Sequence, residues 1–165
     1  LESVNRAPAR FDPEKCRWVN QQHLMKLTPE ELVAASDSTA TREMLLSVQE
    51  KISLLTDIPG AVAFYLDPDF PIDTTVLDKV KKNESTASLL KSLAGSFSEL
   101  TDWSLAKGAI GDTAKANAAK PGQLMFPLRI ALSGKSGGPD LGAILEILGK
   151  EECLRRLNRF TALLA

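Results

Sequence analysis

The chain has 165 residues, of which 44 % are apolar and 25 % charged, and its net charge is −1. This length suffices for one domain or two small ones with a buried core. The longest apolar run is far shorter than the roughly 20 residues that a membrane-spanning helix needs, and no secretory signal pattern opens the chain. The composition therefore predicts a cytoplasmic protein and excludes a membrane protein.

The charges are unevenly distributed along the chain. Residues 41–100 carry 6 basic and 9 acidic side chains, whereas residues 101–165 carry 9 basic and 6 acidic ones. A basic C-terminal third can bind phosphate in a chain that is nearly neutral, although solvated helix surfaces show similar differences by chance. Cys16 and Cys153 lack metal-ligand spacing, so we expect two buried and reduced thiols.

Leu, Ala, Lys and Glu dominate the sequence, and only 5 % of the residues are aromatic. Because strand-favouring runs are also scarce, we predict an all-α fold. The first expected helix begins at Pro13 after the cap Asp12, and it turns Trp18, Val19 and Leu24 towards the core.

Caps, apolar spacings of three or four residues and breakers divide the rest of the chain into further segments. We expect helices that begin at the caps Thr28, Thr39 or Thr41, and Asp73 or Thr74 and end near residues 36, 55 and 82. Further helices are expected at 61–66, from Asn83 or Ser85 to 97, from 101 onwards, at 140–148 and at 150–164, with a dense apolar segment at 124–132.

Breakers also predict where the chain divides. Pro59-Gly60 and the Pro- and Asp-rich stretch 67–71 are expected to interrupt it, and a division is expected near 68–73 or near 98–102. We predict two small helical subdomains, residues 1–100 with an N-terminal linker and residues 101–165. Residues 134–139 form a flexible loop whose Pro139 suits the first turn of the next helix, and Gly149 ends that helix.

The sequence contains little that could carry catalysis. His23 is its only histidine, and it is expected to lie at the surface or to be half-buried. Gly134-Lys135-Ser136 lacks the preceding glycine and strand of a phosphate-binding loop. No group of Cys, His, Asp and Glu has the spacing of a metal site. We therefore predict no catalytic residue and no metal ligand.

Two motif regions go beyond this general picture. Residues 126–134 read F-P-L-R-I-A-L-S-G, residues 138–141 read G-P-D-L, and residues 144–151 read I-L-E-I-L-G-K-E. This C-terminal part resembles the end of bacterial glutamyl-tRNA synthetases, whose pattern is P-L-R-x-A-L-T-G, a short loop, G-P-x-L and L-G-K-E. Residues 11–24 resemble the family's F-D-x-x-K-L-x-W-L-N-x-x-Y-I, with Cys16 and His23 in place of leucine and tyrosine. Residues 37–120 match mainly by helix order.

The resemblance implies a function for the chain. Members of this family join glutamate to tRNA with ATP, and their catalytic H-I-G-H-like and K-M-S-K-S-like signatures do not occur here. The chain then corresponds to a helical bundle or cage that binds the anticodon. Its expected partner is a glutamate-accepting tRNA and not DNA, and it is expected to be a monomer. ATP and magnesium would bind to the catalytic part of the parent enzyme.

Physical needs and the resemblance together select candidate RNA-binding residues. Arg129 follows a proline in an apolar segment, where it either contacts RNA or pairs with Asp140. Gly138, Pro139 and Leu141 belong to a loop whose backbone can approach a base, or which only connects two helices.

Three further candidates rest on the resemblance alone. Ser133 keeps the hydroxyl of the threonine that is usual in the family. Lys51 aligns with a position where family members often carry an arginine that reads the third anticodon base, although it can equally be a solvated lysine. Trp18 aligns with a tryptophan near the tRNA-facing side, and the alternative is a core tryptophan.

Two other functions compete with tRNA recognition. A helical protein-interaction domain would expose a contiguous apolar patch and would not bind RNA. An independent enzyme would need the chemistry that the sequence lacks.

Overall fold

The computed structural model describes residues 12–164, and no strand occurs among them. The predicted all-α fold is therefore confirmed. The helices are α1 (Pro13–Leu24), α2 (Pro29–Ser36), α3 (Arg42–Val48), η1 (Gln49–Lys51), η2 (Leu55–Asp57), α4 (Ile58–Leu66), α5 (Thr74–Lys81), α6 (Thr86–Glu99), η3 (Trp103–Leu105), α7 (Ala106–Ala116), α8 (Pro121–Ser133) and α9 (Leu141–Leu164). The N-terminal linker predicted before residue 12 lies outside the described residues.

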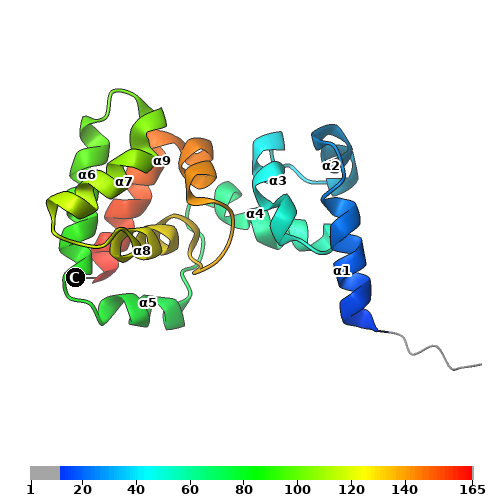
Figure 1. Cartoon of the computed structure of the whole chain (residues 1–165), viewed down its shortest axis with the longest axis horizontal. Helices are drawn as coiled ribbons and strands as arrows, with labels where there is room; N and C mark the ends of the chain where they lie inside the picture. The colour runs from blue at the N-terminus through cyan, green and yellow to red at the C-terminus, as the bar shows by residue number, and fades with distance from the viewer. Residues whose placement is uncertain (1–11, 165) are drawn as a thin grey trace, which may run out of the picture.

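The helices form two lobes (Figure 1). We call residues 12–66, with α1 to α4, the first lobe and residues 74–164, with α5 to α9, the second lobe. The linker between them, residues 67–73, coincides with one of the two expected breaks. The boundary at residue 100 stays a prediction, and it falls between α6 and α7, which pack against each other and against α8 and α9.

Local capping begins several of these helices as the sequence predicts. The carboxylate of Asp12 accepts hydrogen bonds from the first amides of α1 at 3.0 and 3.1 Å. Thr28 and Glu31 form a capping box at α2, and Thr41 and Asp73 cap α3 and α5.

The prediction that Trp18, Val19 and Leu24 together form the inner face of α1 is wrong. Leu24 is buried, but Trp18 is 61 % exposed and Val19 is 40 % exposed. The reason is that α1 meets the rest of the lobe largely through amide side chains. Asn20 donates to the Ser53 carbonyl and Gln21 donates to the Glu50 carbonyl.

Three more expectations about the first lobe are wrong. The helix expected to reach residue 55 ends at Val48, because the Asp57 carboxylate accepts hydrogen bonds from the amides of Ser53 and Leu54 and stabilises a turn. Pro59 does not interrupt a helix, since it lies in the first turn of α4, where a proline needs no amide hydrogen. Cys16 is exposed and only Cys153 is buried as predicted. Burial raises the pKa of the Cys153 thiol to about 12.

The second lobe is built around α6 and α9. The expected apolar side of α6 is confirmed, because Leu89, Leu90, Leu93 and Phe97 are all buried. Gly149 has the non-helical backbone angles φ 72° and ψ 172° inside α9, so the predicted end of a helix there is also confirmed. The prediction that Pro139 lies in the first turn of this helix is wrong, because α9 begins at Leu141 and Asp140 caps it, its carboxylate accepting from the Gly142 amide at 2.9 Å.

A buried arginine lies at the centre of the second lobe. Arg156 is only 1 % exposed, and it donates to the Glu152 carboxylate and to the Leu132 carbonyl, both at 2.6 Å. Its guanidinium lies 4.6 Å from the centre of the Phe70 ring. Within residues 12–164, none of the helices combines the length and apolarity needed to cross a membrane.

We expect the stability of the fold to depend on Glu152 at acid pH. Hydrogen bonds from Arg155 and then Arg156 lower the pKa of Glu152 from 4.5 to about 2, against the opposing effect of burial. A carboxyl group with a lowered pKa stabilises the fold fully above its unfolded value and loses that effect as the pH falls. The free energy of unfolding should therefore fall between pH 4.5 and pH 2. Urea titrations at several pH values should show that the free energy of unfolding depends less on pH in Glu152→Gln than in the unchanged chain. The same pH dependence in both would contradict the role of Glu152.

Candidate nucleic-acid interface

Arg129 lies near the C-terminal end of α8, where its half-buried guanidinium faces the α8–α9 loop, residues 134–140. Its Nη1 donates to the Pro139 carbonyl at 2.5 Å. Asp140 instead pairs with Lys107, at 3.2 Å between Oδ1 and Nζ. The expected alternative, an ion pair between Arg129 and Asp140, is therefore wrong.

The hydrogen-bonding capacity of Arg129 remains largely unused. A guanidinium has five N–H donors, and within residues 12–164 the Pro139 carbonyl is the one acceptor bonded to it. No carboxylate of the described residues lies within 4.0 Å of it. A partly desolvated charge without a counter-ion is suited to an anionic or polar ligand such as a phosphate or a base edge.

The α8–α9 loop lies beside this guanidinium. Residues 135–138 are exposed, whereas Pro139 is buried and Leu141 is only 2 % exposed. Gly138 is therefore the candidate of this segment that a ligand can reach directly, while Pro139 and Leu141 hold the end of the loop against the core. Lys135 Nζ donates to the Gly60 carbonyl of α4 at 3.2 Å, so the loop also contacts the first lobe.

Ser133 is buried below the loop. Its hydroxyl lies 2.8 Å from the Arg129 carbonyl, to which it donates, and 3.4 Å from the Lys135 carbonyl. The hydroxyl is thus used to hold the end of α8. In this position Ser133 supports the backbone that carries Arg129.

Tyr65 lies in α4, the helix of the first lobe that contacts α8. Its hydroxyl lies 3.0 Å from that of Ser47 in α3. Burial raises the pKa of Tyr65, and the hydrogen bond with Ser47 and the charges of Arg129 and Arg156 oppose that rise. The Tyr65 hydroxyl is therefore bonded within the first lobe.

Lys51 and Trp18 lie in the first lobe, and no hydrogen bond or ion pair of the described residues joins them to the α8–α9 loop. Lys51 is exposed at the end of η1, on a turn that α1 fixes through Gln21 and Asn20. The high exposure of Trp18 makes the core-tryptophan interpretation wrong.

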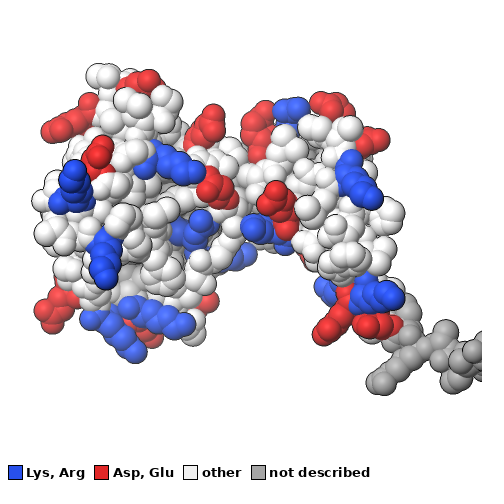
Figure 2. All heavy atoms as spheres, viewed as in Figure 1, with Lys and Arg blue, Asp and Glu red and all other residues white. Residues whose placement is uncertain are grey.

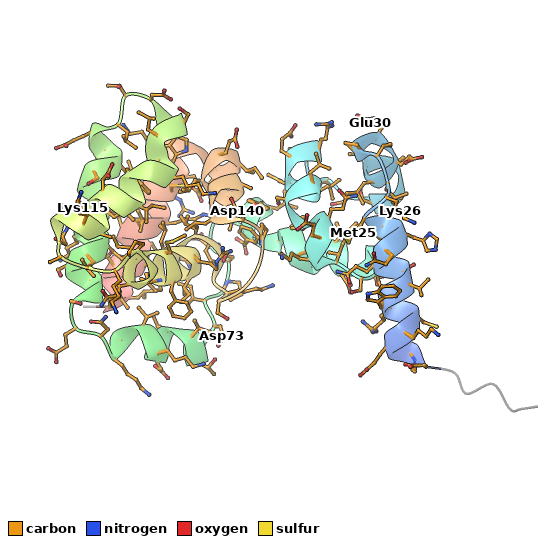
Figure 3. All side chains as sticks on the ribbon, in the orientation of Figure 1. Met25, Lys26, Glu30, Asp73, Lys115 and Asp140 are labelled. Atoms are coloured by element: carbon orange, nitrogen blue, oxygen red, sulfur yellow. The ribbon has the colours of Figure 1, made fainter. Side chains whose placement is uncertain are left out.

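The surface carries charges of both signs. Figure 2 shows basic side chains where the two lobes meet and along α5, with acidic side chains among them. Asp140 lies on the side of the second lobe that faces the first, whereas Lys26 and Glu30 lie on the outer part of the first lobe (Figure 3). Among residues 12–164, no three His, Cys, Asp or Glu side chains come together in a way that could hold a metal ion.

Sequence reasoning missed Lys135 as a residue of this region. The sequence signal for Lys135 is a lysine in a glycine-rich loop between Arg129 and Gly138. At the level of the sequence, this lysine is weighed only as part of a phosphate-binding loop. Its contact with Gly60, 75 positions away, could not be read from local sequence.

Comparison with known proteins decides the family. The family model of the anticodon binding domain matches residues 17–161. The chain belongs to this family. As an anticodon-binding domain, the chain is similar to the glutamate–tRNA ligase of Akkermansia muciniphila, at 36 % identity over 98 % of this chain and 39 % of the relative. It is also 34 % identical to that of Clostridium acetobutylicum, over 94 % of this chain and 35 % of the relative.

Solved structures agree with this assignment. A glutamate tRNA ligase of Elizabethkingia meningosepticum, crystallised with its amino acid, superposes with a TM-score of 0.81 and 28 % identity, over 98 % of this chain and 34 % of that one. Glutamate–tRNA synthetase of Elizabethkingia anophelis gives a TM-score of 0.74 at 26 % identity, over 96 % and 33 % of the two chains. The anticodon-binding domain described here thus spans less than two fifths of the length of these relatives. The match does not favour an interaction domain without RNA binding.

Proposed function

We propose that this chain recognises the anticodon of a glutamate-accepting tRNA as part of a glutamate–tRNA ligase. Membership of the anticodon-binding family and similarity to ligases of that name support the proposal. The structural observation that carries the proposal is the guanidinium of Arg129. It is half-buried, has no carboxylate partner among the described residues and lies beside an exposed loop.

The chemistry of a single-stranded anticodon fits such a site. Unstacked bases expose polar edges that side chains and backbone groups can bind. The planar fork of Arg129 can donate two hydrogen bonds to one base edge or one phosphate. The exposed backbone around Gly138 can approach the same nucleotide, and Lys51 and Trp18 can supply a cation and a stacking surface from the first lobe.

The role in a longer enzyme is also a proposal. In a ligase of the relatives' length, ATP and magnesium would bind outside this chain, and the anticodon contacts would supply binding and discrimination of the tRNA. We further propose that the protein acts as a monomer in the cytoplasm, where its tRNA substrate would be charged.

The proposal is tested by titrating the chain with glutamate tRNA and with the same tRNA carrying a changed anticodon, at two salt concentrations. We expect tighter binding to the native anticodon and weaker binding at the higher salt concentration, because phosphate contacts release counterions. Arg129→Ala should weaken binding to the native tRNA by about 10- to 100-fold, the equivalent of roughly 1–3 kcal/mol for a bidentate base contact.

Two variants serve as controls for this titration. Arg129→Lys keeps the charge but loses the fork, so it should restore little of the discrimination between anticodons. Arg42→Ala removes an exposed arginine of α3 whose partner, Glu30, lies in the same lobe, and it should leave discrimination unchanged. Equal affinity for both tRNAs, or no binding at low salt, would contradict anticodon recognition by this chain.

A further inference from the structure

The linker between the lobes is held by arginine side chains. Arg155 Nη2 donates to the Pro68 carbonyl at 2.6 Å. Arg159 donates to three consecutive carbonyls, those of Pro68 at 3.1 Å, Asp69 at 3.4 Å and Phe70 at 3.3 Å. Both guanidiniums also lie 3.7 Å from the Asp69 carboxylate. We call Arg155 and Arg159 of α9 the arginine clamp.

The Phe70 side chain and the C-terminal end of the linker are also held in place. Phe70 is 3 % exposed, and its ring lies under the guanidiniums of Arg156 and Arg159, at 4.6 and 5.5 Å from the ring centre. The Asp73 amide donates to the Gly134 carbonyl at 3.1 Å. The linker is therefore fixed to α9 on one side and to the end of α8 on the other.

This arrangement differs from that of an ordinary connection between domains. Such linkers are exposed, have few contacts and permit relative motion by default. Here three consecutive carbonyls accept from the clamp, so residues 68–70 belong mechanically to the second lobe. The two lobes also touch directly, through α3 with α9 and α4 with α8, and through Lys135 with Gly60.

We propose that the arginine clamp is a positioning device that holds the two lobes in one relative orientation. The linker begins where α4 ends, so fixing residues 68–70 on α9 fixes the C-terminal end of α4 relative to the second lobe. As a consequence that rests on the proposed function, Lys51 of the first lobe and Arg129 of the second face one RNA in a fixed relation. Preorganisation of this kind lowers the entropy lost on binding.

The distance between the lobes tests the clamp without RNA. A spin label on Cys16 reports the first lobe, and one introduced through Lys115→Cys reports the second, where Lys115 lies at the outer end of α7 (Figure 3). Cys153 stays unlabelled because it is buried and its thiol pKa is raised to about 12. Double electron–electron resonance then gives the distribution of distances between the labels.

We expect a narrow distribution for the otherwise unchanged chain and a clearly broader one for Arg155→Ala combined with Arg159→Ala. Both side chains are partly exposed, at 42 % and 32 %, so the variant should fold, as circular dichroism would verify. Arg159→Ala alone serves as the second variant. Arg42→Ala, which removes an ion pair within the first lobe, should leave the distribution narrow. A distribution as narrow in both clamp variants as in the unchanged chain would overturn the positioning role.

The effect of the arginine clamp on tRNA binding is measured in a separate experiment. In the variant with Arg155→Ala and Arg159→Ala, we expect the affinity for tRNA to fall about tenfold, because the first lobe is no longer held in its binding orientation. Adding Lys51→Ala to that variant should lower the affinity much less than Lys51→Ala does in the unchanged chain. Broader distances with unchanged affinity would support the clamp and overturn its effect on RNA binding. If the unchanged chain bound no tRNA, the proposed function would fail while the distance measurement still decided on the clamp.

Discussion

Arg156→Ala should lower the free energy of unfolding by about 3–5 kcal/mol, from the lost buried hydrogen bonds and the cavity that the deleted side chain leaves. Arg156 is almost completely buried, and the substitution would leave the Leu132 carbonyl without its donor and Glu152 with one arginine fewer. It would also open a cavity beside the Phe70 ring. Urea unfolding followed by circular dichroism measures the change.

The neighbouring arginine provides a matched control. Arg155 binds the same carboxylate, at 2.7 Å from its Nε, but its side chain is 42 % exposed. A solvent-screened pair contributes little, so Arg155→Ala should cost about 1 kcal/mol or less. Similar losses for both variants would show that burial of Arg156 does not govern its contribution.

Gly134→Ala should be the second strongly destabilising change, with an expected loss of about 2–4 kcal/mol from backbone strain and steric contact together. Gly134 has φ +73°, and a Cβ atom there would lie 2.5 Å from the Pro71 carbonyl oxygen and 2.9 Å from the Phe70 ring. Neither neighbour can yield easily, because one is backbone and the other is buried beneath arginines. The urea midpoint of the variant would record the loss.

Gly149→Ala measures a backbone cost without a steric contact. Gly149 has nearly the same φ, +72°, but its ψ of 172° places it in another region that essentially only glycine adopts, and a Cβ atom there would meet nothing within 4 Å. Only the backbone conformation is then penalised, at about 1–3 kcal/mol. If Gly134→Ala itself cost no more than about 1–2 kcal/mol, left-handed backbone strain alone would account for it, and the close approach of the linker to α8 would not explain the importance of Gly134.

Sequence reasoning succeeded where structure depends on neighbours in the chain. The capping residues Thr28, Thr41 and Asp73 and the helix end at Gly149 are confirmed, because each acts on backbone within a few positions. The family motifs likewise predicted the family, because they occur in order at both ends of the chain.

The failures lie where distant segments meet. Trp18 has the spacing of a core residue, but Asn20 and Gln21 bind the turn after α3, some 30 positions away, and thereby turn Trp18 outwards. The burial of Arg156 cannot be predicted from local sequence, since no local signal shows that this arginine will pack over Phe70, 86 positions earlier.

The candidate site shows the same division. Arg129 and the following loop could be selected from sequence, and the structure brings Arg129, Gly138 and Pro139 together. Its partner could not be predicted, because whether Asp140 pairs with Arg129 or with Lys107 depends on how α7 packs beside the start of α9. RNA binding by these residues stays a prediction.

The non-helical backbone at Gly149 makes a kink that divides α9 into two helical segments (Figure 1). Residues 141–148 line the groove against α3, and the Leu145 carbonyl near their end accepts from Trp103 Nε1 at 2.8 Å. The following residues carry Cys153, Arg156 and Phe160 into the core. Residues 141–148 can therefore open locally while residues 150–164 stay helical, and amide hydrogen exchange along α9 should divide at Gly149 into two cooperative units.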